Sequence, residues 1–192
     1  MHQSIERALG DALRLQQLLF QSEEVRLQIQ AVAQAVIETF RQGGRVFFCG
    51  NGGSAAEAQH LAAELTGRYY KDRPPLPAEA LHVNTSFITA VANDYTYEET
   101  YARFLEAWGS KADLLWAMST SGNSPNILRA IKTAKKLGMR VVGFTGATGG
   151  KMVGECDYLL KIPSTDTPRI QEAHLLIGHI ICEIVESTLF SS

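Results

Sequence analysis

The chain has 192 residues, of which 45% are hydrophobic and 20% charged, and this size and composition predict one globular domain with a well-buried core. Its net charge of −2 excludes a general attraction to nucleic acid or to an anionic membrane, so any anion site must be local. Because it also has neither a CxxC cysteine spacing nor an apolar stretch of membrane-spanning length, we expect a soluble, cytoplasmic protein with no nucleic-acid or membrane partner.

The first 42 residues have the apolar periodicity of amphipathic helices. We predict two long helices, with a break at residues 21–23 and a stop at Gly43 and Gly44. Two such helices exceed what one side of a small sheet needs. We therefore expect them to form contacts between subunits.

A glycine-rich loop follows a predicted strand at residues 45–49 and precedes a predicted helix at 55–65. The loop reads Asn51-Gly52-Gly53-Ser54, and its glycines allow a sharp turn and a close approach to a ligand. The helix N-terminus behind it favours an anion, and Ser54 either caps that helix or donates to the ligand.

Two residues of the predicted helix, His60 and Glu64, are four positions apart and therefore about 40° apart around the helix and roughly 6 Å along it. Both can face one ligand, as a proton-transfer or metal-binding pair. The loop also fits a loose dinucleotide-binding pattern. That pattern requires an acid about 20 residues further on, where this chain has the basic and proline-rich segment 73–77.

The rest of the chain alternates strands and helices, which predicts a parallel sheet covered on both faces, a three-layer α/β/α sandwich. Strands are predicted at residues 80–83, 113–118, 140–145 and 158–162, and helices at 85–92, 97–108, 127–137 and 168–189.

A second polar loop, residues 119–125, follows the strand at 113–118 and opens the next helix. Four of its hydroxyls converge on a helix N-terminus, which favours phosphate binding over an ordinary capped turn. Ser124 is the expected N-cap, with Pro125 in the first helical position. Ligands of an open α/β sheet bind outside the carboxyl ends of its strands, where both loops and Asn93-Asp94 are expected to lie.

In combination, these motifs resemble those of the phosphoheptose isomerases, a branch of the sugar isomerase (SIS) family. The motifs are Cys49-Gly-Asn-Gly-Gly-Ser54, His60-x-x-x-Glu64-Leu-Thr-Gly-Arg68, Asn93-Asp94, Ser119-Thr-Ser-Gly-Asn-Ser124 and Arg169-Ile-Gln-Glu-x-His174. The resemblance covers nearly the whole chain. It implies a single SIS domain over residues 1–192, with helices 1–42 used in oligomerisation and a flavodoxin-like, five-stranded α/β core over 43–192.

The resemblance also implies an activity, the conversion of D-sedoheptulose 7-phosphate to D-glycero-D-manno-heptose 7-phosphate. This is the first step toward the activated heptoses of bacterial surface glycans, and the family performs it as a homotetramer with active sites between subunits. An aldose–ketose isomerisation moves protons between two carbons and between two oxygens, so it requires a base and an acid. Glu64 and His179 match the catalytic pair of the family.

The other site residues are carried over by motif. Phosphate binding is assigned to Ser119, Thr120, Ser121 and Ser124, and contact with the sugar to Asn51, Gly52, Gly53, Ser54, Arg68, Asn93, Asp94 and Gln171. The resemblance implies zinc on His60, Glu64, Gln171 and His179.

The spacing of Gln171 and His179 limits this zinc site. Eight residues span roughly 12 Å and about 80° of a straight helix, too far for two zinc bonds of about 2 Å from one chain. Either the helix is distorted or a neighbouring subunit supplies one of the two ligands, and we favour the neighbour. Some relatives have an Asp directly before the Arg-Ile-Gln run; here Pro168 stands there and Asp166 is the nearest acid.

Two alternatives remain from the sequence. A paralogue of these isomerases binds the replication initiator and lacks the glutamate of the His-x-x-x-Glu pair, so Glu64 favours the enzyme. A regulatory module that binds sugar phosphates would need the serine loop but neither Glu64 nor His179.

Overall fold

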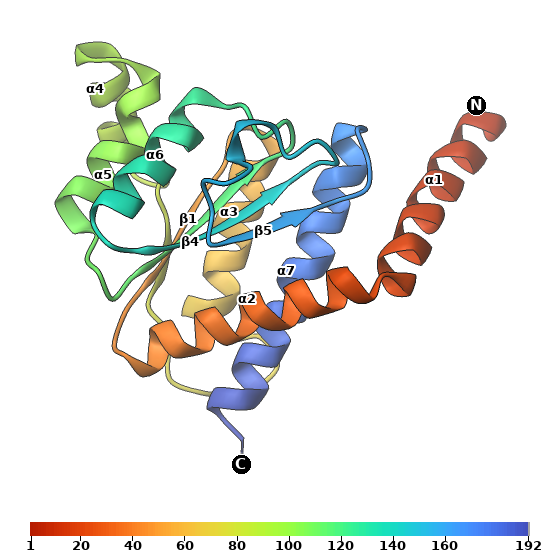
Figure 1. Ribbon diagram of the computed structural model, residues 1–192, viewed down its shortest axis with the longest axis horizontal. Coiled ribbons are helices and arrows are strands. Elements are labelled where there is room, and N and C mark those ends of the chain that lie inside the picture. Colours follow the sequence, from red (N-terminus) through yellow and green to blue (C-terminus); the bar gives the residue numbers. More distant parts are fainter. Residues whose placement is uncertain (192) are drawn as a thin grey trace.

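The structure is a computed structural model that describes residues 1–191, and two long helices open it. Helix α1 (His2–Gln21) and helix α2 (Glu23–Arg41) are separated at Ser22, whose Oγ accepts a hydrogen bond from the Val25 N–H at 3.2 Å. This N-cap confirms the predicted break, because it ends one helix and starts the next. α1 projects away from the body of the molecule (Figure 1) and leaves several large apolar side chains exposed, among them Leu9 and Phe20.

The sheet has five parallel strands in the order β2-β1-β3-β4-β5, the doubly wound order of flavodoxin-like folds. The strands are β1 (Val46–Cys49), β2 (Ala78–Ala80), β3 (Leu114–Ser119), β4 (Arg140–Thr145) and β5 (Tyr158–Lys161). The predicted five-stranded parallel sheet is confirmed. The bounds of the second strand were wrong: after Ala80 the chain makes one more bond, from Leu81 N to Phe48 O, and then turns toward the next helix.

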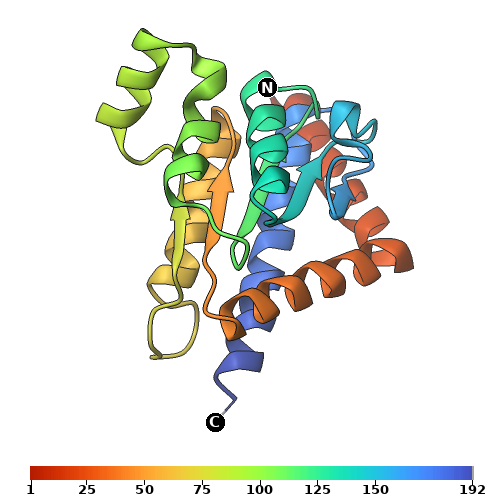
Figure 2. The ribbon, with the colours of Figure 1, turned by 60° about the vertical axis from the view of Figure 1, so that its left-hand side comes forward.

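Helices cover both faces of this sheet (Figures 1 and 2). After α1 and α2, the helices of the chain are α3 (Gly53–Thr66), α4 (Thr85–Asp94), α5 (Thr100–Trp108), α6 (Pro125–Lys136) and α7 (Thr167–Leu189), with short 3-10 turns η1 (Tyr97–Glu99) and η2 (Gly150–Met152). The predicted helix at 97–108 is thus a 3-10 turn followed by an α-helix. Its junction is tightened by the Thr100 hydroxyl, which donates to the Tyr97 carbonyl at 2.8 Å.

Alternate residues of the central strands feed two separate cores. Phe48 and Trp116 pack with the buried faces of α2, α3 and α7, whereas Phe47 and Leu115 pack with α5 and α6. A fully buried large apolar side chain contributes about 1.5–3 kcal/mol, so each core is a substantial source of stability. The three-layer α/β/α prediction is confirmed.

Helices α3 and α7 lie side by side and run in the same direction, because successive residues of one contact successive residues of the other. Gln171 is next to Ser54, His174 next to Glu57, and Gly178 next to Leu61. A Cβ on Gly178 would lie 2.6 Å from both Leu61 Cδ atoms, so glycine permits this close approach. The contact places the polar residues of both helices opposite one another.

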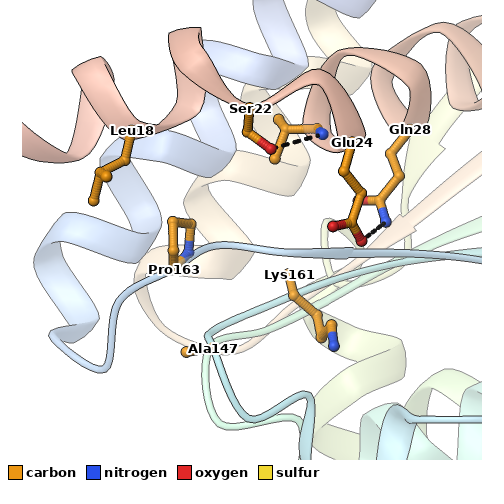
Figure 3. A pocket seen from close by; sticks show the side chains of 8 residues that line it. Leu18, Ser22, Glu24, Gln28, Ala147, Lys161 and Pro163 are labelled. Carbon is orange, nitrogen blue, oxygen red and sulfur yellow. Dashed lines mark hydrogen bonds between the residues drawn. The ribbon is translucent and has the colours of Figure 1, made fainter.

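A hollow of about 390 Å³ opens beneath the junction of α1 and α2, next to the end of β5 (Figure 3). Leu18, Lys161 and Pro163 line it, and Gln28 Nε2 donates to Glu24 Oε1 at its rim at 3.4 Å. Its lining contains none of the predicted site residues. The predicted catalytic pair, Glu64 and His179, lies elsewhere, on α3 and α7.

Candidate active site

Three predicted site residues meet in the middle of the α3–α7 contact. His60 Nε2 lies 2.7 Å from His179 Nε2 and 3.2 Å from Glu64 Oε1. One ligand atom from each residue lies within 4.8 Å of the others. The side chains of His60 and Glu64 are 46% and 23% exposed, so a substrate or an ion can reach the group from solvent.

This group fits a zinc ion by the chemistry of its donors. Two imidazole nitrogens and a carboxylate oxygen are common zinc ligands, and three protein ligands leave a coordination position open for water or substrate. The imidazoles face each other through their Nε2 atoms, and a cation between them would accept a lone pair from each.

Gln171, the predicted fourth ligand, lies elsewhere in this chain. Its Nε2 donates to Ser54 Oγ at 3.4 Å, and its amide packs on Gly53, where a Cβ would lie only 2.5 Å from Nε2. Ser54 precedes His60 by six residues, or about 9 Å along α3. α7 is continuous from Thr167 to Leu189, so no distortion brings Gln171 to His179.

The glycine loop closes the sheet edge before α3. Gly52 is the N-cap, with a φ of 56°, a conformation that favours glycine. Of the two roles expected for Ser54, capping the helix is therefore wrong, and donation to a ligand stays a prediction. α3 begins at Gly53, and Ser54 is already inside the first turn, 3% exposed.

Asn51 ties this loop to the next one. Its amide exchanges two hydrogen bonds of 2.8 Å with Asn126, in the first turn of α6, and its Oδ1 also accepts from the Tyr97 hydroxyl at 3.1 Å. The predictions missed Asn126 and Tyr97. Asn126 could have been indicated by one sequence signal, its position directly after Pro125 at the start of a predicted helix. No signal indicated Tyr97.

The serine loop lies at the carboxyl end of β3, as predicted. Ser119 Oγ is 3.0 Å from Ser124 Oγ, and Ser124 is the N-cap residue of α6, without a side-chain capping bond. Gly122 has a φ of 67°, and a Cβ there would lie 2.1 Å from the Gly149 carbonyl oxygen, so the loop requires glycine. Its hydroxyls and the start of α6 form a polar, anion-favouring surface.

The remaining predicted residues are exposed. Asn93 and Asp94 end α4, where Asn93 Nδ2 donates to Asp94 Oδ1 at 2.9 Å, and Arg68 follows Gly67, the C-cap residue of α3. The ring of Tyr69, a residue absent from the predictions, has its centroid 5.9 Å from that of His179. No sequence signal marked Tyr69 apart from its place beside Arg68.

A buried polar pair lies between the His60–Glu64–His179 group and the sheet edge. His174 Nδ1 is 3.9 Å from Glu57 Oε2, and neither atom has a hydrogen-bond partner among the described residues. Burial raises the pKa of Glu57 to about 8 despite a hydrogen bond from Ser54, and burial lowers the pKa of His174 to about 4 despite its bond to the Thr145 carbonyl. Both side chains are therefore held neutral at pH 7.

The fold and these residues define a class of protein, a doubly wound α/β domain with an anion-favouring edge and a His–Glu–His group on two neighbouring helices. The family model described as "SIS domain" matches residues 14–146. The chain belongs to the phosphoheptose isomerase branch of the SIS-domain family.

Three relatives illustrate this membership. The phosphoheptose isomerase of Aneurinibacillus thermoaerophilus is 46% identical and that of Burkholderia pseudomallei (strain 1710b) 50%; the alignments cover 99% and 97% of this chain and 96% and 94% of the relatives. The structure of phosphoheptose isomerase from Neisseria gonorrhoeae matches with a TM-score of 0.90 and 36% identity, over 97% of this chain and 98% of that one.

Proposed function

We propose that this chain is an aldose–ketose isomerase that converts D-sedoheptulose 7-phosphate to D-glycero-D-manno-heptose 7-phosphate. One observation carries the proposal: a carboxylate and two imidazoles meet within 4.8 Å on a chain that aligns with phosphoheptose isomerases over nearly its full length. The reaction is the first step toward activated heptoses.

The reaction removes a proton from C1 of the ketose and returns one to C2 through an enediol, while O1 loses a proton and O2 gains one. Glu64 is proposed to carry the carbon proton, and His179 to serve the oxygens. Both side chains are accessible to solvent, and both contact His60. This arrangement supports their use on one substrate.

Zinc is the proposed cofactor, one ion per subunit, held by His60, Glu64 and His179. When bound, it would polarise the carbonyl and enediolate oxygens and stabilise the charge that develops on them. The carboxylate–imidazole donor set supports zinc over a hard cation such as Mg²⁺, which prefers oxygen ligands.

The phosphate is proposed to bind Ser119, Thr120, Ser121 and Ser124 at the start of α6, and the sugar to contact Asn51, Gly52, Gly53, Ser54, Arg68, Asn93, Asp94 and Gln171. The hydroxyl pair of Ser119 and Ser124 supports the first assignment, and the amide of Gln171 beside Ser54 the second.

A homotetramer of one-domain subunits, with active sites at the interfaces, is proposed from two features of the surface. Leu176 and Ile180 flank His179 on α7 and are 38% and 37% exposed, and α1 adds further exposed apolar side chains. The separation of Gln171 from His179 also favours a Gln171 supplied by a neighbouring subunit as the fourth zinc ligand.

Among residues 1–191, no helix combines the length and apolarity that a membrane crossing requires. A cytoplasmic location stays a prediction.

The proposal is tested by assaying the isomerisation of sedoheptulose 7-phosphate after chelation and again after zinc is added back. We expect turnover that depends on zinc. No turnover in either condition would favour the replication-initiator or regulatory alternatives. Binding of the substrate without turnover would single out the regulatory module.

A further inference from the structure

Arg73 and Glu186 form a buried ion pair at the far end of the α3–α7 contact. Arg73 Nε lies 2.9 Å from Glu186 Oε1, and the two side chains are only 2% and 3% exposed. Burying two charges costs several kcal/mol unless their remaining donors and acceptors are also satisfied. Here they are satisfied by backbone groups next to the candidate active site.

The guanidinium of Arg73 caps the C-terminal end of α3. It donates to the carbonyls of Glu64 at 2.9 Å, Leu65 at 2.7 Å and Gly67 at 3.2 Å. These carbonyls have no partner within the helix, and the last turn of α3 has no basic residue of its own. A cation at this end also complements the helix dipole. Arg73 therefore fixes the turn of α3 that carries Glu64.

The carboxylate of Glu186 holds the loop that follows α3. It accepts hydrogen bonds from the backbone N–H groups of Tyr69 at 3.0 Å, Tyr70 at 2.7 Å and Lys71 at 2.9 Å. Burial alone would raise the pKa of Glu186, but these bonds and Arg73 outweigh it and hold the pKa at about 2. The carboxylate is ionised at neutral pH.

Glu186 lies seven residues after His179, which is about two turns and the same face of α7. The ion pair thus connects the turn that carries Glu64 to the helix that carries His179. The loop held by Glu186 also places the Tyr69 ring against the His179 imidazole.

We propose that Arg73 and Glu186 are positioning residues that hold Glu64 and His179 at the separation needed to bind a divalent cation. The inference rests on the proposed zinc site. Partners that orient metal ligands from outside the coordination sphere typically change metal affinity 10–100-fold when they are removed.

The test is the double variant Arg73→Gln/Glu186→Gln, which leaves no unpaired buried charge. Its matched control is Arg45→Gln/Asp113→Asn, which removes another ion pair with a buried carboxylate; Arg45 stacks on Phe47, on the other face of the sheet. For each protein the dissociation constant for Zn²⁺ is measured by chelator competition without substrate, together with the thermal unfolding midpoint and kcat.

We expect both double variants to unfold at lower temperature, but only Arg73→Gln/Glu186→Gln to bind Zn²⁺ at least tenfold more weakly and to lose kcat in proportion. If that variant does not fold, Arg73→Lys is measured instead; it keeps the charge but cannot bridge the carbonyls, and should also weaken Zn²⁺ binding several-fold. A dissociation constant for Zn²⁺ within threefold of that of the parent protein would overturn this inference but not the proposed zinc site. A parent protein that binds no Zn²⁺ would overturn the metal site as well.

Discussion

The contact between α3 and α7 has an accessible glutamate in its middle and a buried glutamate on either side. In the middle, Glu64 is 23% exposed in its side chain and lies beside His60. Toward the ends, Glu57 and Glu186 are 8% and 2% exposed. Of these three glutamates a substrate can reach only the middle one, so the same residue type is available for chemistry in one place and serves the packing of the two helices in the others.

The two buried glutamates, Glu57 and Glu186, also differ from each other. Glu186 accepts four hydrogen bonds and has its pKa lowered to about 2, whereas Oε2 of Glu57 has no hydrogen-bond partner and the Glu57 pKa is raised to about 8. Burial disfavours the charged form of both carboxylates, and only Glu186 has enough hydrogen-bond donors around it to outweigh that effect.

Replacement of Glu64 is expected to have the largest effect, on activity. Glu64→Gln keeps the size of the side chain but removes the base, and general acid–base catalysis contributes about 10²–10⁴-fold. We expect kcat for sedoheptulose 7-phosphate to fall by about 10³-fold or more, with substrate binding still detectable by calorimetry. The free energy of unfolding should change by less than about 0.5 kcal/mol. A fully active variant would contradict the assignment.

Replacement of Glu186, unlike that of Glu64, is expected to lower the free energy of unfolding. Glu186→Leu leaves Arg73 buried without its counter-charge, a change that typically costs about 3–5 kcal/mol of unfolding free energy. Denaturant titration measures it, with Glu183→Ala as the control, because Glu183 is exposed on the same helix. Equal stability of the two variants would mean that the ion pair contributes nothing.

Glu57 is expected to make the free energy of unfolding depend on pH. Its pKa is raised on folding, from 4.5 to about 8, so above pH 4.5 the unfolded chain loses a proton that the folded chain keeps, and stability falls as pH rises. The pKa of His174 is lowered from 6.5 to about 4, so its neutral form adds stability as pH rises to 6.5, which opposes the Glu57 effect in that range.

Between pH 6.5 and 8 the effect of Glu57 is therefore unopposed by His174, and its slope is up to about 1.4 kcal/mol per pH unit. In Glu57→Gln this loss should vanish, and the rise below pH 6.5 caused by His174 should become visible. Denaturant midpoints across pH 4–8 measure both; parallel curves for the variant and the parent would show that Glu57 is ionised in the folded protein.

Much of the fold follows from local sequence signals. The apolar runs, the glycine turns and Pro125 and Pro168 near helix starts predict the alternation of strands and helices because each acts over a few residues. The second strand was predicted to start two residues and to end three residues too late, because its bounds depend on pairing with β1, a contact made at long range.

The site was predicted less completely for the same reason. His60 and Glu64 share one helical face, so their spacing is enough to pair them, whereas His179 joins them only through the packing of α7 on α3. Arg73 was read only as part of a basic, proline-rich loop that argues against a dinucleotide site, because its partner Glu186 lies 113 residues further along the chain.

The smallest expected effect concerns the sheet edge, where the serine hydroxyls face a helix N-terminus. Ser124→Ala removes one hydroxyl while α6 keeps Pro125 and its backbone N–H groups, and one hydrogen bond is worth about 0.5–1.5 kcal/mol. We expect KM for the sugar phosphate to rise by about two- to tenfold at nearly unchanged kcat, because binding to the phosphate is the same in the ground and transition states. Ser187→Ala, at the exposed end of α7, should leave KM unchanged. A fall in kcat at constant KM would instead give Ser124 a role in the chemical step. The proposed division between phosphate binding at the sheet edge and catalysis at the α3–α7 contact would then be wrong.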